Sequence, residues 1–135
     1  MESKTFLDFL PTNFRHEKSF FIQNNLTDFE KLSNLSDQDI NEIQRKSSLC
    51  TLNNLKKIRA IAIFKKEIGI SPPHAYLLLH CGIGSIKTLS QTTPYELKSR
   101  IGRLERSLRV KIKTDITFTL LKEWIIKATQ IYKSI

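Results

Sequence analysis

Two similar segments 57 positions apart impose the strongest limit on the fold of this chain. The segment LTDFEKLSNLSDQDI (26–40) aligns with IGSIKTLSQTTPYEL (83–97) at apolar, hydroxyl and acidic positions alike. Agreement at all three kinds of position argues against a chance match. We therefore expect helical hairpins built on one plan, with an internal repeat of residues 20–47 and 77–104.

Helix start and stop signals recur along the chain, while the apolar–polar alternation that is typical of strands is absent. A hydroxyl residue three positions before an acid predicts a capping box. Three such pairs occur: Thr27 with Glu30, Ser36 with Asp39, and Thr93 with Glu96. Asn25 and its aligned partner Gly82 both tolerate the left-handed conformation that ends a helix. These signals predict an all-α fold.

The predicted helices cover most of the sequence, at residues 13–24, 28–34, 37–47, 52–67, 72–81, 86–91, 94–109 and 117–133. The C-terminal helix at 117–133 is amphipathic, and its apolar face contains Trp124, which we therefore expect in the core. A chain of 135 residues has the length of one compact domain. The expectation is a single helical domain over residues 1–135, closed by this helix.

The composition argues against a secreted protein and against a membrane span. The longest uncharged stretch, residues 68–85, is interrupted by prolines, glycines and histidines. The N-terminus shows no basic region followed by an apolar block, so a signal peptide is not expected. Cys50 and Cys81 form no CxxC pair, and free thiols are typical of a reducing compartment. We expect a cytoplasmic location or an equivalent one such as a plastid stroma.

The charge is distributed unevenly along the sequence. Residues 1–42 contain four bases and eight acids, whereas residues 43–135 contain 18 bases and five acids. Such asymmetry favours an acidic or polyanionic partner for the C-terminal two-thirds. The alternative is a solvated surface in a lysine-rich protein.

The stretch GISPPHAYLLLHCGI (69–83) resembles a helix-hairpin-helix motif, in which a Gly-hydrophobic-Gly turn precedes an alanine, a leucine pair and a closing Gly-hydrophobic dipeptide. With the segments GSIKTLSQTTPYEL and LLKEWIIKATQ, it is similar to a tandem helix-hairpin-helix family of unknown function from bacteria and cyanobacteria. The resemblance covers roughly residues 20–130. It implies tandem helix-hairpin-helix-like units and no assigned activity.

The hairpin is degenerate when compared with nucleic-acid-binding members of the motif, in which backbone N–H groups donate to a phosphate. Gly69 fills the first glycine position and Ile70 the apolar position, but Ser71 replaces the second glycine. Pro72 and Pro73 have no N–H group to donate. Gly69 and Ser71 are therefore expected to contribute a weakened phosphate contact at most.

A stronger electrostatic feature is the segment KSRIGRLERSLRVKIK (98–113), which contains seven bases and one acid. The bases are Lys98, Arg100, Arg103, Arg106, Arg109, Lys111 and Lys113. Arginine suits phosphate because its planar guanidinium donates two hydrogen bonds at once. This helix is therefore a candidate contact to a nucleic-acid backbone, and the alternatives are an acidic protein surface or a solvated helix face.

Signatures of catalysis are missing from the sequence. It contains no Walker loop, no dinucleotide-binding glycine turn and no paired carboxylates placed for acid–base work. His80 and Cys81 are adjacent and would point about 100° apart on a helix, so they do not suit a shared metal ion. We expect no enzyme activity, no cofactor, no metal and no small-molecule substrate.

The sequence thus predicts a non-catalytic binding module that contacts a nucleic-acid backbone, DNA or RNA, without sequence preference. The predicted binding residues are Arg100, Arg103, Arg106, Arg109, Lys111, Lys113, Gly69 and Ser71. The alternative is a protein–protein interaction adaptor whose basic surface docks an acidic partner.

Overall fold

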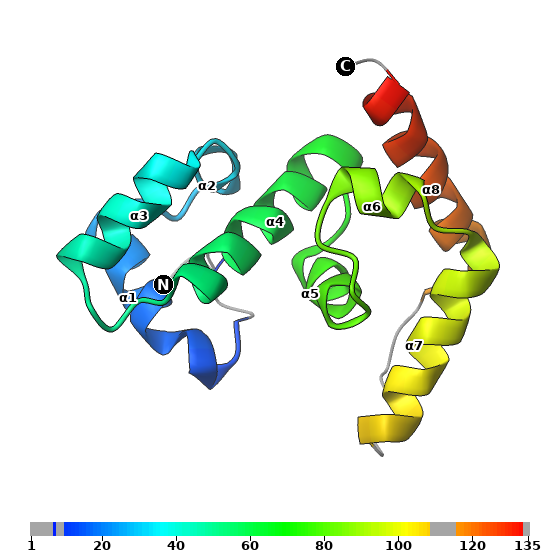
Figure 1. Ribbon diagram of the computed structural model, residues 1–135, viewed down its shortest axis with the longest axis horizontal. Coiled ribbons are helices and arrows are strands. Elements are labelled where there is room, and N and C mark those ends of the chain that lie inside the picture. The colour runs from blue at the N-terminus through cyan, green and yellow to red at the C-terminus, as the bar shows by residue number, and fades with distance from the viewer. Residues whose placement is uncertain (1–6, 8–9, 109–115, 134–135) are drawn as a thin grey trace, which may run out of the picture. The chain divides into compact units, whose positions relative to one another are not determined.

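The computed structural model describes residue 7, residues 10–108 and residues 116–133. These residues form eight α-helices and a short 3-10 helix, with no strand among them, which confirms the predicted all-α fold. The elements are η2 Thr12–Phe14, α1 Arg15–Gln23, α2 Phe29–Ser33, α3 Asp37–Lys46, α4 Leu52–Ile68, α5 Pro72–His80, α6 Ile86–Ser90, α7 Pro94–Leu108 and α8 Phe118–Lys133 (Figure 1). Each α-helix begins and ends within two residues of its predicted bounds. None of these helices combines the length and the apolar composition that crossing a bilayer requires.

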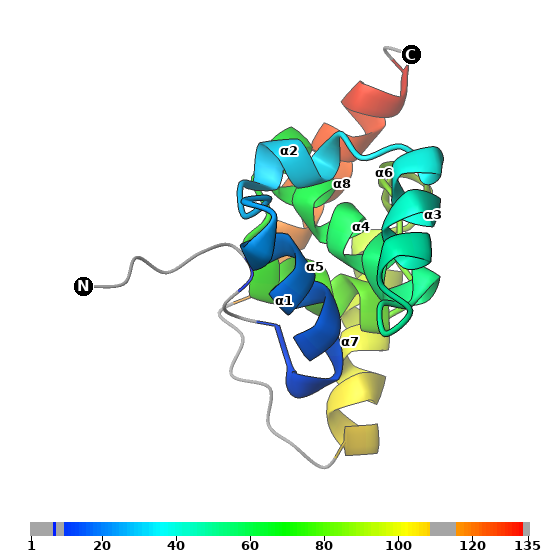
Figure 2. The same cartoon turned by 90° about the vertical axis from the view of Figure 1, so that its left-hand side faces the viewer.

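The chain divides into two compact units, Met1–Pro73 and His74–Ile135. In the first unit α2 and α3 pack along α4 (Figures 1 and 2). Leu32 in α2, Ile40 in α3 and Ile58 in α4 have no exposed surface. The core of this unit is therefore built from the apolar faces of three amphipathic helices. That both units belong to a single domain stays a prediction.

In the second unit α6 and α7 pack on α8. Trp124 is 4 % exposed, and Leu121 and Ala128 on the same helix are buried as well. Positions 121, 124 and 128 follow the spacing of three and four residues that places side chains on one helix face. The predicted core position of Trp124 is confirmed.

Side chains at the helix starts supply the acceptors that the first backbone N–H groups need. The hydroxyl of Ser36 accepts a hydrogen bond from the Asp39 N–H at 3.0 Å, and the Ser36 N–H donates to the Asp39 carboxylate at 2.9 Å. This capping box was predicted and is confirmed. The predicted box between Thr27 and Glu30 is wrong, because Asp28 is the cap of α2 and accepts from the Glu30 N–H at 3.1 Å. Thr27 and Asp28 are both residue types that cap helices well, and in the structure it is the Asp28 carboxylate that caps α2.

Left-handed residues end three of the helices. Asn25 has φ 56°, Gly69 has φ 85° and Gly82 has φ 84°. At Gly69 and Gly82 the next residue is a fully buried isoleucine, Ile70 or Ile83, which fixes the direction of the chain as it leaves the helix. The predicted left-handed conformations of Asn25 and Gly82 are confirmed.

The order of helices in the two units follows the repetition seen in the sequence. Helix α5 has the same length as α1 and begins 57 positions later, and α6 stands in the same relation to α2. The first residues of α3 and α7, Asp37 and Pro94, are also 57 positions apart. Residues related by this shift can therefore be compared directly.

Candidate binding surface on α7

Three of the basic residues on α7 are exposed in the described part of the helix: Lys98, Arg103 and Arg106. Because an α-helix advances about 100° per residue, they lie within an arc of about 140°. Leu97 and Ile101, on the opposite side of the helix, are buried. The exposed arc can therefore present three cations to a ligand. The predicted binding residues Arg109, Lys111 and Lys113 lie outside the described residues.

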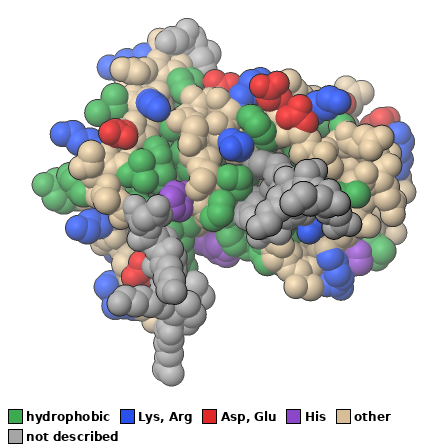
Figure 3. All heavy atoms as spheres, turned by 180° about the vertical axis from the view of Figure 1, so that it is seen from behind, with side chains coloured by type: hydrophobic (Ala, Val, Ile, Leu, Met, Phe, Trp, Pro, Cys, Tyr) green, Lys and Arg blue, Asp and Glu red, His purple; other side chains and the backbone are tan. Residues whose placement is uncertain are grey.

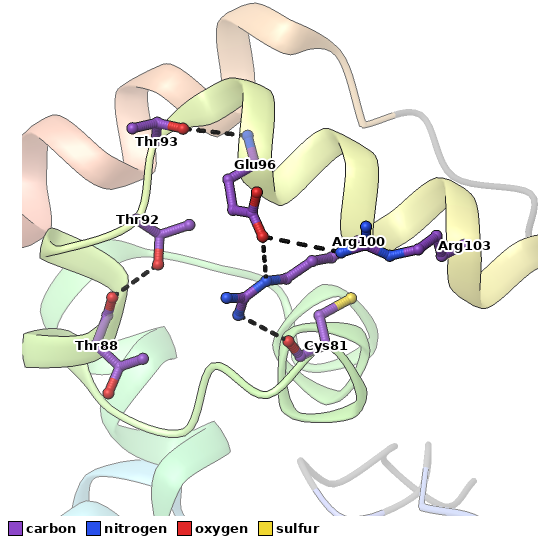
Figure 4. A network of polar contacts seen from close by, with 7 residues as sticks. All are labelled: Cys81, Thr88, Thr92, Thr93, Glu96, Arg100 and Arg103. Carbon is purple, nitrogen blue, oxygen red and sulfur yellow. Dashed lines mark hydrogen bonds and ion pairs between the residues drawn. The ribbon is translucent and has the colours of Figure 1, made fainter.

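Arg100 has a different environment from the exposed arginines. Its Nε donates to the Glu96 carboxylate at 3.0 Å, and its terminal nitrogen donates to the carbonyl oxygen of Cys81 at 3.2 Å (Figure 4). Cys81 directly follows the last residue of α5, where carbonyl groups lack partners within the helix and the dipole favours a cation. Arg100 therefore ties α7 to the end of α5 from within the fold.

Glu96 interacts with both Arg100 and Arg103 on α7. Its backbone N–H donates to the Thr93 hydroxyl at 3.1 Å, and its carboxylate points to Arg100 (Figure 4). The nearest atom of the Arg103 guanidinium lies 3.8 Å from the same carboxylate oxygen, at the limit of an ion pair. Arg103 is 60 % exposed at its side chain, so this weak pairing leaves it accessible to a ligand.

Gly69 and Ser71 lie at the turn between α4 and α5. The N–H group of Gly69 donates to the carbonyl oxygens of Lys65 and Phe64, at 3.0 and 3.1 Å. That N–H group is therefore committed to ending α4, and the side chain of Ser71 is exposed immediately before Pro72. The turn is a well-formed helix stop.

A second turn with a complete Gly-hydrophobic-Gly sequence stands at Gly82-Ile83-Gly84, and it was not singled out from the sequence. The Gly82 N–H donates to the Leu79 carbonyl at 3.1 Å, three residues earlier, whereas the Gly69 N–H donates to carbonyls four and five residues earlier. Both helices end at a left-handed glycine. Ser85 then caps α6 by accepting from the Thr88 N–H. The glycine pair itself is the signal in the sequence that marks this turn.

Two of the histidines, His74 and His80, contact aromatic rings in the described structure. The ring of His74 lies 5.7 Å from that of Trp124, and the ring of His80 lies 4.5 Å from that of Tyr76. Burial raises the pKa of the Cys81 thiol, and nearby Arg100 offsets part of this effect. Within the described ranges no three His, Cys, Asp or Glu side chains come together as a metal site requires.

A cleft of about 310 Å³ lies between α7 and the start of α8. Its described ionisable residues are Lys98 and Glu105, and its apolar lining includes Ile101 and Phe118. Lys98 and Glu105 lie about two turns apart on α7, so the cleft presents a base and an acid to a polar group.

Replacing Arg100 with alanine is expected to lower the free energy of unfolding of the second unit by about 1 kcal/mol, because two hydrogen bonds from a cation are lost. Arg100→Lys should retain part of this stability. Arg106→Ala, an exposed control on the same helix, should change it by less than about 0.5 kcal/mol. Urea unfolding followed by the fluorescence of Trp124 measures the effect, and equal stability of all three variants would contradict the internal role of Arg100.

The described residues define an all-helical protein of two compact units with an exposed basic arc on α7. The chain belongs to the family described as Domain of unknown function (DUF4332), which matches residues 11–131. No curated protein matches the chain. No solved structure matches it either.

Proposed function

We propose that this protein is a non-catalytic binding module that contacts the phosphate backbone of nucleic acid through α7 and the basic residues that follow it. The observation that carries the proposal is the exposed arc of Lys98, Arg103 and Arg106 on one helix. Arg109, Lys111 and Lys113 continue the same run of bases in the sequence.

The charge of the second unit supports this proposal. Residues 74–135 contain 11 bases and four acids, whereas residues 1–73 contain 11 bases and nine acids. One of the four acids, Glu96, is already paired with Arg100. An excess of cations on one unit attracts a polyanion without reading its sequence.

The turn at Gly69 makes a smaller contribution to the proposed contact. Its own N–H group is used within the fold, and the two prolines after Ser71 offer none. Contact at Gly69 and Ser71 is therefore limited to the N–H and hydroxyl groups of the serine. The arginines of α7 dominate the proposed interface, because guanidinium–phosphate pairs are charge-assisted and bidentate.

The triple variant Lys98→Gln, Arg103→Gln and Arg106→Gln tests the proposal. Wild type should bind duplex DNA, single-stranded DNA or structured RNA, with an affinity that falls steeply between about 50 and 200 mM salt. The variant should bind at least about tenfold more weakly at the lower salt, and its salt slope should be smaller by about two to three. Fluorescence anisotropy of labelled oligonucleotides measures both quantities.

A matched control removes the same charge from the first unit. Lys31, Arg45 and Lys56 are all exposed, and their replacement with glutamine should leave the salt slope nearly unchanged. An equal loss in the control would show that net charge alone attracts the nucleic acid. The absence of binding by wild type at either salt would refute the proposal.

An adaptor that docks an acidic protein is the second candidate, and one observation favours it. Tyr95, Ile126 and Tyr132 of the second unit are exposed by 77 %, 47 % and 41 %. Hydrophobic side chains lie beside lysines and arginines on this unit, on the left of Figure 3. Interfaces between proteins combine apolar and charged groups in this way. Replacing Ile126 with serine should weaken an adaptor interface and leave the binding of nucleic acid unchanged.

A further inference from the structure

A groove between α1 and α3 in the first unit is the starting point of this inference. Its volume is about 340 Å³. Phe20 and the buried Ile43 contribute apolar lining, and the exposed residues Asn24, Asp39 and Glu42 also line it. The groove therefore combines an apolar surface with two carboxylates.

Equivalent turns allow the two units to be compared residue by residue at this place. The Leu26 N–H donates to the Phe21 carbonyl at 2.8 Å after α1, and the Ile83 N–H donates to the Leu78 carbonyl at 2.9 Å after α5. Each bond spans five residues, and the two donors are 57 positions apart. The chain thus leaves α1 and α5 in the same way.

Three lining residues have equivalents, 57 positions later, that are bonded to one another. Asn24 corresponds to Cys81, Asp39 to Glu96, and Ile43 to Arg100. In the second unit the Arg100 guanidinium joins the carbonyl of Cys81 to the carboxylate of Glu96, as Figure 4 shows. In the first unit an isoleucine stands at the arginine position, and the groove is open. Asp39 keeps a carboxylate at the position of Glu96, and Asn24, at the position of Cys81, also lines the groove.

We propose that this groove binds an arginine side chain of a partner polypeptide, in the place that Arg100 takes in the second unit. The guanidinium hydrogen-bonds to the carboxylate of Asp39 and the carbonyl of Asn24, and Glu42 adds a second negative charge. The planar guanidinium suits this combination, because it donates in several directions at once. Apolar neighbours of the arginine pack on Phe20. The inference concerns the first unit and does not depend on the proposed contact to nucleic acid.

The charge of the groove supports this choice of occupant. Lys46 is the one base among its described lining residues, so Asp39 and Glu42 leave it with an excess of negative charge. The Ser36 N–H already donates to one oxygen of Asp39, and hydrogen bonds from Ser36 hold the pKa of this carboxyl below its ordinary value. A carboxylate has about four acceptor positions, so Asp39 retains capacity for a guanidinium.

The experiment titrates the isotope-labelled full chain with acetyl-Leu-Arg-Leu-amide and follows the backbone amide signals by NMR. The signals of Asn24, Asp39 and Glu42 should shift with rising peptide concentration. A peptide in which citrulline replaces arginine has nearly the same shape without the charge, and it should bind at least about tenfold more weakly. Equal binding of the two peptides, or shifts confined to other residues, would overturn the proposal.

Three variants make the test specific. Glu42→Gln should weaken binding of the arginine peptide by about threefold or more, whereas Glu67→Gln, which removes an exposed acid of α4 outside the groove, should not. Ile43→Arg should block the peptide, because the new side chain fills the groove as Arg100 does in the second unit. If Ile43→Arg fails to fold, the affinities of Glu42→Gln and Glu67→Gln for the arginine peptide test the proposal, and equal affinities would overturn it. Self-association of the protein without peptide, with loss of the same signals, would assign the groove to a second copy and overturn the proposal as well.

Discussion

Replacing Trp124 with alanine is expected to lower the free energy of unfolding of the second unit by about 3–5 kcal/mol. The side chain is 4 % exposed, and Leu121 and Ala128 are buried on the same face of α8. Its ring also lies 5.7 Å from that of His74 in α5. Removal leaves a cavity that α8 cannot close, because α6 and α7 both pack on this helix. Far-UV circular dichroism during urea unfolding measures the loss, which corresponds to a shift of about 1–5 M in the midpoint.

The variant Trp124→Phe is the matched control for this prediction. It retains an aromatic ring of smaller size, so the expected loss is less than half of that caused by alanine. A loss below about 1 kcal/mol for Trp124→Ala would contradict the central packing role of the residue. Binding of nucleic acid by the phenylalanine variant should match wild type, since α7 remains held by Arg100 and Glu96.

The helices could be predicted from the sequence because their start and stop signals are local. Ser36 and Asp39 lie three residues apart and bond to each other, so both partners of the capping box are visible in one short stretch of sequence. Gly82 ends α5 through a conformation that its residue type permits. The prediction failed where two caps were adjacent, at Thr27 and Asp28, because sequence spacing alone does not rank two good acceptors.

The candidate site was less predictable, because the role of a cation depends on what lies beside it in space. All four arginines of 98–113 have the same chemistry in the sequence, yet Arg100 donates to a carbonyl 19 residues earlier in the chain. The ion pair of Arg100 with Glu96 follows an i, i+4 spacing that is visible in the sequence. The contact with Cys81 joins residues 19 positions apart, and no local pattern pairs them. The occupant proposed for the groove beside Asp39 likewise rests on a contact between distant residues, the one between Arg100 and Cys81.

The buried acid Glu17 is another feature that sequence reasoning missed. It is 1 % exposed and lies in the first turn of α1. Its carboxylate accepts from the Thr51 N–H at 2.8 Å and from the Asn54 side-chain amide at 3.2 Å, at the start of α4. The signal was present, since Phe14, Glu17 and Phe21 follow the helical spacing that marks a buried face. The carboxylate thus lies near the N-termini of two helices, where the dipoles favour a negative charge.

Replacing Glu17 with alanine is expected to lower the free energy of unfolding of the first unit by about 3 kcal/mol. Two partly buried donors at the start of α4 would lose their acceptor, and the negative charge that both helix dipoles favour would be gone. Glu17→Gln tests the charge and the hydrogen bonds more directly, because it retains the size of the side chain. Its amide NH2 would face either the Thr51 N–H or the Asn54 amide, and two donors cannot bond to each other. It should therefore lose at least half as much stability as alanine. Urea unfolding by circular dichroism gives both values, and a Glu17→Gln variant as stable as wild type would show that shape alone holds the start of α4 against α1.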